Sequence, residues 1–179
     1  FCAMFANEKN FVIRTLFYGI KPTKKDFEEI NYEKLVIYCS RQLILPAIYV
    51  NLRQKGCLRY LNAQFRRYLK EIYQINYNRN TKLISEIHCI SELFQKNNLK
   101  HVFLKGSALL IGEFYSDIGE RMINDIDILV EEKNIKKVER LMNEFSYHPL
   151  KNYTFFQENN KHLHRMTKQG KIFAVEIHK

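Results

Sequence analysis

The chain has 179 residues, of which 46% are hydrophobic and 27% charged, as in a globular protein that can bury a core. It contains no apolar run long enough to cross a bilayer, and Glu8, Lys9 and Arg14 interrupt the opening segment, which does not fit a signal peptide. We therefore expect a soluble, cytoplasmic protein with no membrane partner. The net charge of +10 favours anionic partners such as nucleotides or nucleic acid. Because the sequence lacks an initial Met, we also expect a piece of a longer protein.

The cysteines are spread over the chain, at Cys2, Cys39, Cys57 and Cys89. None belongs to a C-x-x-C pair, and their spacing indicates neither a disulfide framework nor a zinc site. We expect them to be buried free thiols in a reducing environment.

The first 97 residues carry the apolar spacing of helices. One helix is expected from Tyr32 to about Leu45, where Pro46 ends or restarts it. Two further apolar stripes recur at intervals of three or four residues, the period of an α-helix. These stripes are Leu61, Phe65, Leu69 and Ile72, and then Leu83, Ile87, Ile90 and Phe94. The sequence thus predicts a helical region over residues 1–97.

Residues 59–80 interleave basic side chains with tyrosines, as at Arg66, Arg67 and Tyr68. Such a segment can bind single-stranded nucleic acid by pairing with phosphates and stacking on bases. The same residues also suit an amphipathic helix with tyrosines at the edge of the core and cations in solvent. We favour the amphipathic helix. If the segment binds nucleic acid instead, its affinity for a generic oligonucleotide should be measurable and should fall steeply with salt.

The pattern changes after Asn98, and residues 98–179 predict a region of strands alternating with helices. In chain order we expect a buried strand over residues 99–104, a turn at 105–107, a helix to about Tyr115, a strand over 124–130, a helix over 135–145, and a hairpin of 161–166 with 172–178. The predicted fold class is α/β (α+β), with a helical region followed by a core that has a mixed sheet.

Two aspartates, Asp125 and Asp127, alternate with Ile126 and Ile128 in the second of these strands. Because successive strand residues point to opposite faces, both carboxylates lie on one face and both isoleucines point into the core. Like charges this close repel unless a cation neutralises them, and Mg²⁺ is commonly held by carboxylates together with substrate phosphates. Taken alone, a D-x-D is better explained by one capping aspartate and one ion pair with Lys or Arg.

The tripeptide Lys105-Gly106-Ser107 stands one helix before the aspartates. Gly106 permits close approach of the backbone, and Ser107 can cap the helix that follows. Free N–H groups at a helix start bind phosphate oxygens, and Lys105 adds positive charge. Alone, this tripeptide is an ordinary strand-to-helix turn. Together with the D-x-D it predicts a triphosphate site that faces a metal site.

A third carboxylate, Glu176, lies in the last predicted strand on the same face as Ala174 and His178. An acid in an apolar strand is costly to bury unless it is paired or bound to a metal. The sequence therefore predicts three strand-borne carboxylates in one site.

The succession of "LKGSALL", "FYSDIGERMINDIDILV" and "VEIH" resembles the polymerase-β-type nucleotidyltransferase superfamily, and more closely the bacterial nucleotidyltransferase family proteins. The resemblance covers roughly residues 30–179 and is specific from Leu104 onward. The gap between Gly106 and Asp125 is longer than in the superfamily's short version. The family also continues beyond Lys179, so elements that bind the acceptor or the base are expected outside this chain.

The resemblance implies magnesium-dependent transfer of a nucleoside monophosphate, with AMP favoured, from a nucleoside triphosphate such as ATP to an unidentified acceptor. Two Mg²⁺ ions are implied, with Mn²⁺ as an alternative, and the third acid would also assist deprotonation of the acceptor. The implied metal ligands are Asp125, Asp127 and Glu176, and the implied nucleotide contacts are Gly106, Ser107, Lys105 and Arg121. We expect Asp125→Asn to abolish turnover with little loss of folding.

Several alternatives stay open beside this interpretation. Arg121 suits a phosphate contact and, equally, an ion pair with Asp117 or Glu120. His162, His164 and His178 could be drawn with Glu176 as a zinc site, but no ligand spacing supports one, and hydrogen bonding near the acids is favoured. The rivals to an enzyme are a module that binds nucleotide or a partner without turnover, and an RNA-binding helical protein.

Overall fold

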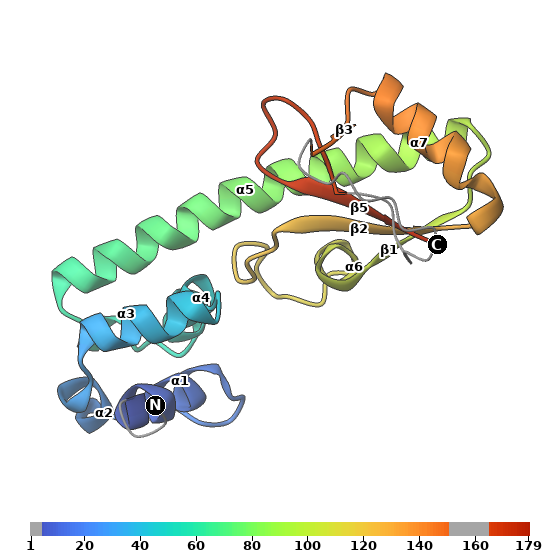
Figure 1. Cartoon of the computed structure of the whole chain (residues 1–179). Coiled ribbons are helices and arrows are strands. Elements are labelled where there is room, and N and C mark those ends of the chain that lie inside the picture. The colour runs from blue at the N-terminus through green and yellow to red at the C-terminus, as the bar shows by residue number, and fades with distance from the viewer. Residues whose placement is uncertain (1–4, 151–164) are drawn as a thin grey trace. The chain divides into compact units, whose positions relative to one another are not determined.

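The computed structural model describes residues 5–150 and 165–179 (Figure 1). The chain divides into two compact units. Unit 1 comprises the described residues up to Asn80 together with Tyr115–Met122, and unit 2 comprises Thr81–Phe114 and the described residues from Ile123 onward. The sequence pattern changes near residue 97, whereas the two units divide between Asn80 and Thr81, inside the long helix that spans Ala63–Lys96. The segment 115–122 belongs to unit 1.

Unit 1 is built from helices. They are α1 (Ala6–Leu16), α2 (Lys24–Glu29), α3 (Tyr32–Arg41), α4 (Leu45–Gln54), the 3-10 helix η2 (Leu58–Tyr60) and the first part of α5 (Ala63–Lys96). The helix expected from Tyr32 ends at Arg41 rather than near Leu45, because Leu43 adopts a left-handed φ of 57°. Helix α4 then begins with Pro46 in its first turn, where proline's missing N–H is tolerated.

The core of unit 1 is a continuous apolar cluster to which every α-helix of the unit contributes buried residues, and Leu58 of η2 packs against it. Leu35 of α3, Ile48 of α4 and Leu69 of α5 are each fully buried. No single helix in the described ranges is long and apolar enough to span a membrane; α3 and α4 satisfy that criterion only as a pair, bent by 115° at the break between them.

Unit 2 is a five-stranded sheet with helices. Its elements are the rest of α5, β1 (His101–Leu104), α6 (Lys105–Ile111), β2 (Asp125–Val130), the 3-10 helix η3 (Glu132–Asn134), α7 (Ile135–Glu144), β3 (His148–Pro149), β4 (Met166–Thr167) and β5 (Ala174–His178). The strand order is β1-β2-β5-β4-β3. Strands β2 and β5 run parallel, and the other pairs are antiparallel. The predicted α/β class with a mixed sheet is confirmed.

One face of this sheet forms the core of unit 2. Ile126 and Ile128 of β2 and Val175 and Ile177 of β5 are fully buried, which confirms the predicted alternation. The apolar stripe of α5 that ends at Phe94 is buried with them, as are the inward residues of α7. Figure 1 shows α6 on the opposite side of the sheet from α5 and α7, so the second face is free to carry polar groups beside α6.

A buried polar contact fixes the turn that precedes β5. Glu86 on α5 is 4% exposed, accepts a hydrogen bond of 3.0 Å from the Tyr147 hydroxyl and pairs with Lys171. Lys168 lies over the ring of Phe145, 4.0 Å from its centroid. Both lysines belong to the turn between β4 and β5, so these contacts tether that turn to the helices.

Two of three local expectations for unit 2 need correction. The strand expected to be buried is an edge strand that pairs only with β2. None of its four residues is fully buried, and Val102 is 57% exposed. The helix after Lys105 ends at Ile111 instead of near Tyr115, and Gly112 follows it. The expected hairpin is present as the short antiparallel pairing of Met166 with Val175, while residues 161–164 lie outside the described residues.

The cysteines follow expectation in part. Cys39 and Cys57 are buried free thiols, as predicted. Cys89 is a free thiol on the exposed side of α5, so its predicted burial is wrong, and Cys2 lies outside the described residues.

Candidate active site

Two neighbouring parallel strands bring the acidic residues together. Asp127 of β2 is the register partner of Glu176 of β5, and Asp125 is the partner of Ala174. Because side chains alternate along each strand, the three acids share the face that lies away from the apolar core. Asp127 is 5% exposed, and Glu176 and Asp125 are half-buried. The result is a group of carboxylates on rigid strands, partly screened from solvent.

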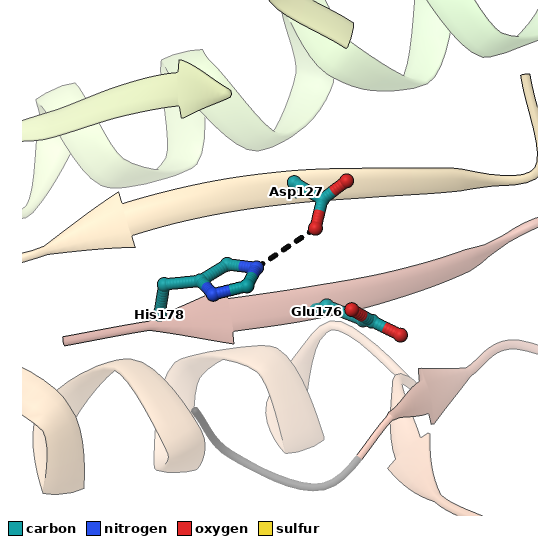
Figure 2. A group of neighbouring side chains, drawn as sticks. All are labelled: Asp127, Glu176 and His178. Atoms are coloured by element: carbon teal, nitrogen blue, oxygen red, sulfur yellow. Dashed lines mark hydrogen bonds and ion pairs between the residues drawn. The ribbon is translucent and has the colours of Figure 1, made fainter. Parts of the chain in front are cut away.

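His178 adds an imidazole to the same face. Its Nε2 lies 2.8 Å from Oδ1 of Asp127. One donor atom from each of Asp127, Glu176 and His178 can be chosen so that all three lie within 4.8 Å of one another. Figure 2 shows the three side chains on the adjacent strands, with the dashed line joining the imidazole to Asp127. Among the described residues this is the group whose spacing suits a metal ion.

Lys105 reaches the same carboxylate from the start of α6. Its Nζ donates a hydrogen bond of 2.6 Å to Oδ1 of Asp127. This hydrogen bond raises the pKa of the Lys105 amine, and the negative charges of Asp127, Glu176 and Asp125 add to the effect. Lys105 also has a left-handed φ of 51°, which is unusual for a residue with a side chain. Backbone strain of this kind is concentrated at functional sites.

Ser107 holds the beginning of β2 in place. Its buried hydroxyl donates to the carbonyl oxygen of Asp125 at 3.2 Å and accepts from the N–H of Asp127 at 3.3 Å. The expected helix cap is therefore wrong, because Ser107 lies inside α6 and Leu104 occupies the N-cap position without a side-chain hydrogen bond. Gly106 does allow a close approach: a Cβ there would lie 3.2 Å from Cγ2 of Ile123. The turn and the D-x-D strand are thus directly linked.

Asp125 lies on the same face but pairs differently. Its carboxylate forms an ion pair with Arg165, and the Asp125 side chain is 25% exposed. The structure therefore brings Asp127 and Glu176 together with His178, and it places Asp125 next to them under the charge of Arg165.

Arg121 and Asp117 belong to unit 1, in the segment 115–122. The guanidinium of Arg121 donates a hydrogen bond of 2.9 Å to the hydroxyl of Tyr115. Its Cζ lies over the Tyr115 ring, 5.9 Å from the ring centroid. Asp117 instead pairs with Arg53, at 2.6 Å, so Asp117 is not the ion-pair partner of Arg121. The phosphate contact predicted for Arg121 stays a prediction.

The segment 115–122 is held by polar side chains of α4 and α5. Asn76 donates to the carbonyls of Gly119 and Arg121, and Asn80 donates to those of Ile118 and Arg121. A Cβ at Gly119 would come within 2.6 Å of the Tyr73 ring, so only glycine fits there. Asn51 and Gln54 complete the attachment through Glu120 and Ser116. The segment is therefore a rigid part of unit 1.

Sequence reasoning placed His178 on the same strand face as Glu176 and favoured a hydrogen bond near the acids, which the contact of its Nε2 with Asp127 confirms. It missed one residue of the site, Arg165. His162 and His164 lie outside the described residues. No local sequence pattern predicted a role for Arg165, because its ion pair with Asp125 joins residues that are 40 positions apart.

The comparison with known families agrees with this geometry. A family model described as "uncharacterised nucleotidyltransferase" matches residues 28–179. The chain belongs to this family. No curated protein and no solved structure matches the chain. As a nucleotidyltransferase family member it is a transferase that acts on a nucleoside triphosphate in general terms, and such enzymes generally depend on a divalent metal.

The residues present fit such a metal. Carboxylate oxygens are the ligands that hard divalent ions prefer, and imidazole is a common further ligand. Asp127 is a nearly buried negative charge, and burying a charge is costly unless a cation compensates it. Lys105 supplies positive charge to that carboxylate in this structure. The donor set of Asp127, Glu176 and His178, with Asp125 adjacent, therefore has the chemistry of a divalent-cation site.

Proposed function

We propose that the chain transfers a nucleoside monophosphate, AMP in the favoured case, from a nucleoside triphosphate to the hydroxyl of an acceptor and releases pyrophosphate. The observation that carries this proposal is the register of Asp127 with Glu176 on parallel strands. It supports a site where two acids from distant parts of the sequence act on one substrate. Family membership supports the class of reaction.

Mg²⁺ is the proposed cofactor, held by Asp127 and Glu176 with Asp125 beside them. When bound, divalent ions neutralise the phosphates and align the attacking and leaving oxygens. Nucleotidyl transfer depends mainly on such alignment and neutralisation of charge. The contribution of the chain is to fix its ligands, and Ser107 does so by hydrogen bonding to both ends of the Asp125–Asp127 segment.

The remaining roles follow from position and charge. Lys105 supplies a protonated amine to the triphosphate, because a lysine side chain is charged at neutral pH. Its hydrogen bond to Asp127 raises its pKa further. Glu176, half-buried and beside Asp127, accepts the proton of the acceptor hydroxyl. The backbone groups of Gly106 and Ser107 contact the β- and γ-phosphates, a role that rests on the family resemblance. Arg121 is carried over as a phosphate contact on the same basis.

The direct test measures pyrophosphate release by the whole chain with each of the four ribonucleoside triphosphates, Mg²⁺ and a cell lysate as the source of acceptor. Asp127→Asn and Asp125→Asn are expected to lower release at least about 100-fold, because each removes a charge that must meet the cation. Glu144→Gln is the matched control, since Glu144 is an exposed carboxylate on α7 that pairs with Arg140 of the same helix. It should leave the rate unchanged.

Three outcomes would contradict the proposal. If Asp127→Asn kept the wild-type rate, the site would be misassigned. If the wild type bound nucleotide saturably but released no pyrophosphate with any triphosphate, the chain would be a binding module instead. Tight oligonucleotide binding that ignores changes at Asp125 and Asp127 would favour the RNA-binding alternative.

A further inference from the structure

We propose that His178 is a metal ligand, and that the resulting set of two carboxylates and one imidazole makes the site bind a first-row transition ion, Mn²⁺, more tightly than Mg²⁺. This inference rests on the proposed function, because it concerns the same cation site. It goes beyond that function by adding a nitrogen ligand to the acidic set and by assigning a metal preference.

The strands place the imidazole where a shared ion needs it. His178 is the register partner of Leu129, two residues beyond the pair of Asp127 with Glu176 and on the same face. The donor atoms of the three residues lie within 4.8 Å of one another. Ligands of one divalent ion, with bonds of about 2.0–2.6 Å, lie roughly 3–5 Å apart. The three side chains can therefore bind one ion without a change in the strands.

The orientation of His178 agrees with this role. Its side chain is only 16% exposed, so the ring has little freedom to turn away. Nε2 faces Asp127 at 2.8 Å, and Glu176 precedes it on the same strand (Figure 2). A histidine that served the core alone would point to the other face, where Val175 and Ile177 are fully buried.

The chemistry of the imidazole sets the preference. Mg²⁺ favours oxygen ligands and water, and it is poorly matched to nitrogen. Imidazole is a better ligand for first-row transition ions than for Mg²⁺, and the affinities of these ions for mixed nitrogen and oxygen sites rise from Mn²⁺ along the series. A nitrogen ligand from His178 beside the two carboxylates should therefore favour Mn²⁺ over Mg²⁺ at this site.

The test uses Mn²⁺ and the full chain. Tripolyphosphate, which contains no nitrogen, replaces the nucleotide, so any nitrogen bound to Mn²⁺ must come from the protein. Pulsed electron paramagnetic resonance detects ¹⁴N coupling when imidazole binds Mn²⁺, and the signal of free Mn²⁺ gives the affinity. Mg²⁺ affinity is measured by competition. His178→Gln is the key variant, because the glutamine amide can still donate to Asp127 but offers no imidazole. His148→Gln is the control, since His148 is exposed on β3.

The wild type and His148→Gln should show ¹⁴N coupling, and His178→Gln should lose it. His178→Gln should weaken Mn²⁺ binding at least about 10-fold, the range seen when groups that support a metal are removed, while Mg²⁺ affinity changes far less. Bound Mn²⁺ without ¹⁴N coupling, or coupling that persists in His178→Gln, would overturn this inference and leave the proposed function standing. Failure of Mn²⁺ to bind, or binding that Asp127→Asn does not weaken, would overturn both.

Discussion

Asp127 of β2 and Glu176 of β5 are register partners on adjacent parallel strands, although the two residues are 49 positions apart in the sequence. Asp127 also accepts hydrogen bonds from Lys105 and His178 on a single oxygen. The pair thus brings two negative charges to one face of the sheet, and the charge of Lys105 offsets only part of them. Such an arrangement favours cation binding over stability.

The first prediction separates those two effects at Glu176. Glu176→Gln removes one of two neighbouring charges and keeps the size of the side chain. We expect the free energy of unfolding to stay the same or to rise by up to about 1 kcal/mol, because repulsion between partly solvated carboxylates is relieved. Pyrophosphate release should fall at least about 100-fold, because the proposed proton acceptor is lost. Urea unfolding and the release assay measure the two quantities.

A second prediction concerns Ser107, which links α6 to β2. Ser107→Ala leaves the buried N–H of Asp127 without its acceptor and removes the donor to the carbonyl of Asp125. We expect a loss of about 1–3 kcal/mol in the free energy of unfolding, the cost of an unsatisfied buried polar group. Ser85→Ala is the control, because Ser85 is exposed on α5 in the same unit. Equal unfolding curves for both variants would show that the hydroxyl of Ser107 does not hold the strand.

The third prediction concerns the anchor of the segment 115–122 in unit 1. Asp117 accepts from Arg53 at 2.6 Å, from the Tyr73 hydroxyl at 3.0 Å and from the N–H of Gly119 at 2.8 Å. Asp117→Ala should lower the free energy of unfolding by about 2–3 kcal/mol, since hydrogen bonds to a charged group are lost together. Arg53 is partly exposed, and solvent reduces its share.

Glu28→Ala serves as the control for that anchor. Glu28 pairs with Lys24 on the exposed side of α2, and such surface pairs contribute at most about 0.5 kcal/mol. Circular dichroism during urea unfolding reports both variants. If Asp117→Ala cost no more than Glu28→Ala, the segment would be held by its asparagine contacts instead.

The sequence was sufficient to predict the strand faces of the site. Alternation in β2 correctly separates Ile126 and Ile128 from the aspartates, and the same rule in β5 puts Glu176 beside His178. These predictions succeed because the period of a strand is a local property. The presence of a helical region before an α/β region is predictable for the same reason.

The sequence was not sufficient for contacts that join distant residues. The pairing of Asp125 with Arg165 and the attachment of Gly119 to Asn76 depend on how elements pack, which no local pattern encodes. Ser107 shows the limit most clearly. Its position after a turn predicts a helix cap, but the packing of α6 against β2 offers it two backbone partners instead.

The last prediction is the dependence of stability on pH that Cys39 produces. Burial raises the pKa of the Cys39 thiol from its usual 9.0 to about 12. Between those values the unfolded chain releases the proton and the folded chain keeps it, so the folded state binds more protons and loses stability as the pH rises. The contribution is fully present below about pH 9, and it declines above this by at most about 1.4 kcal/mol per pH unit. Cys39→Ala should remove this slope from unfolding curves measured between pH 8 and 11, whereas Cys89→Ala, at an exposed thiol on α5, should leave it unchanged. If the slope survived Cys39→Ala in full, it would have to come from other groups that titrate at alkaline pH. Tyr147 is one of them, because burial and the neighbouring Glu86 raise the pKa of its hydroxyl.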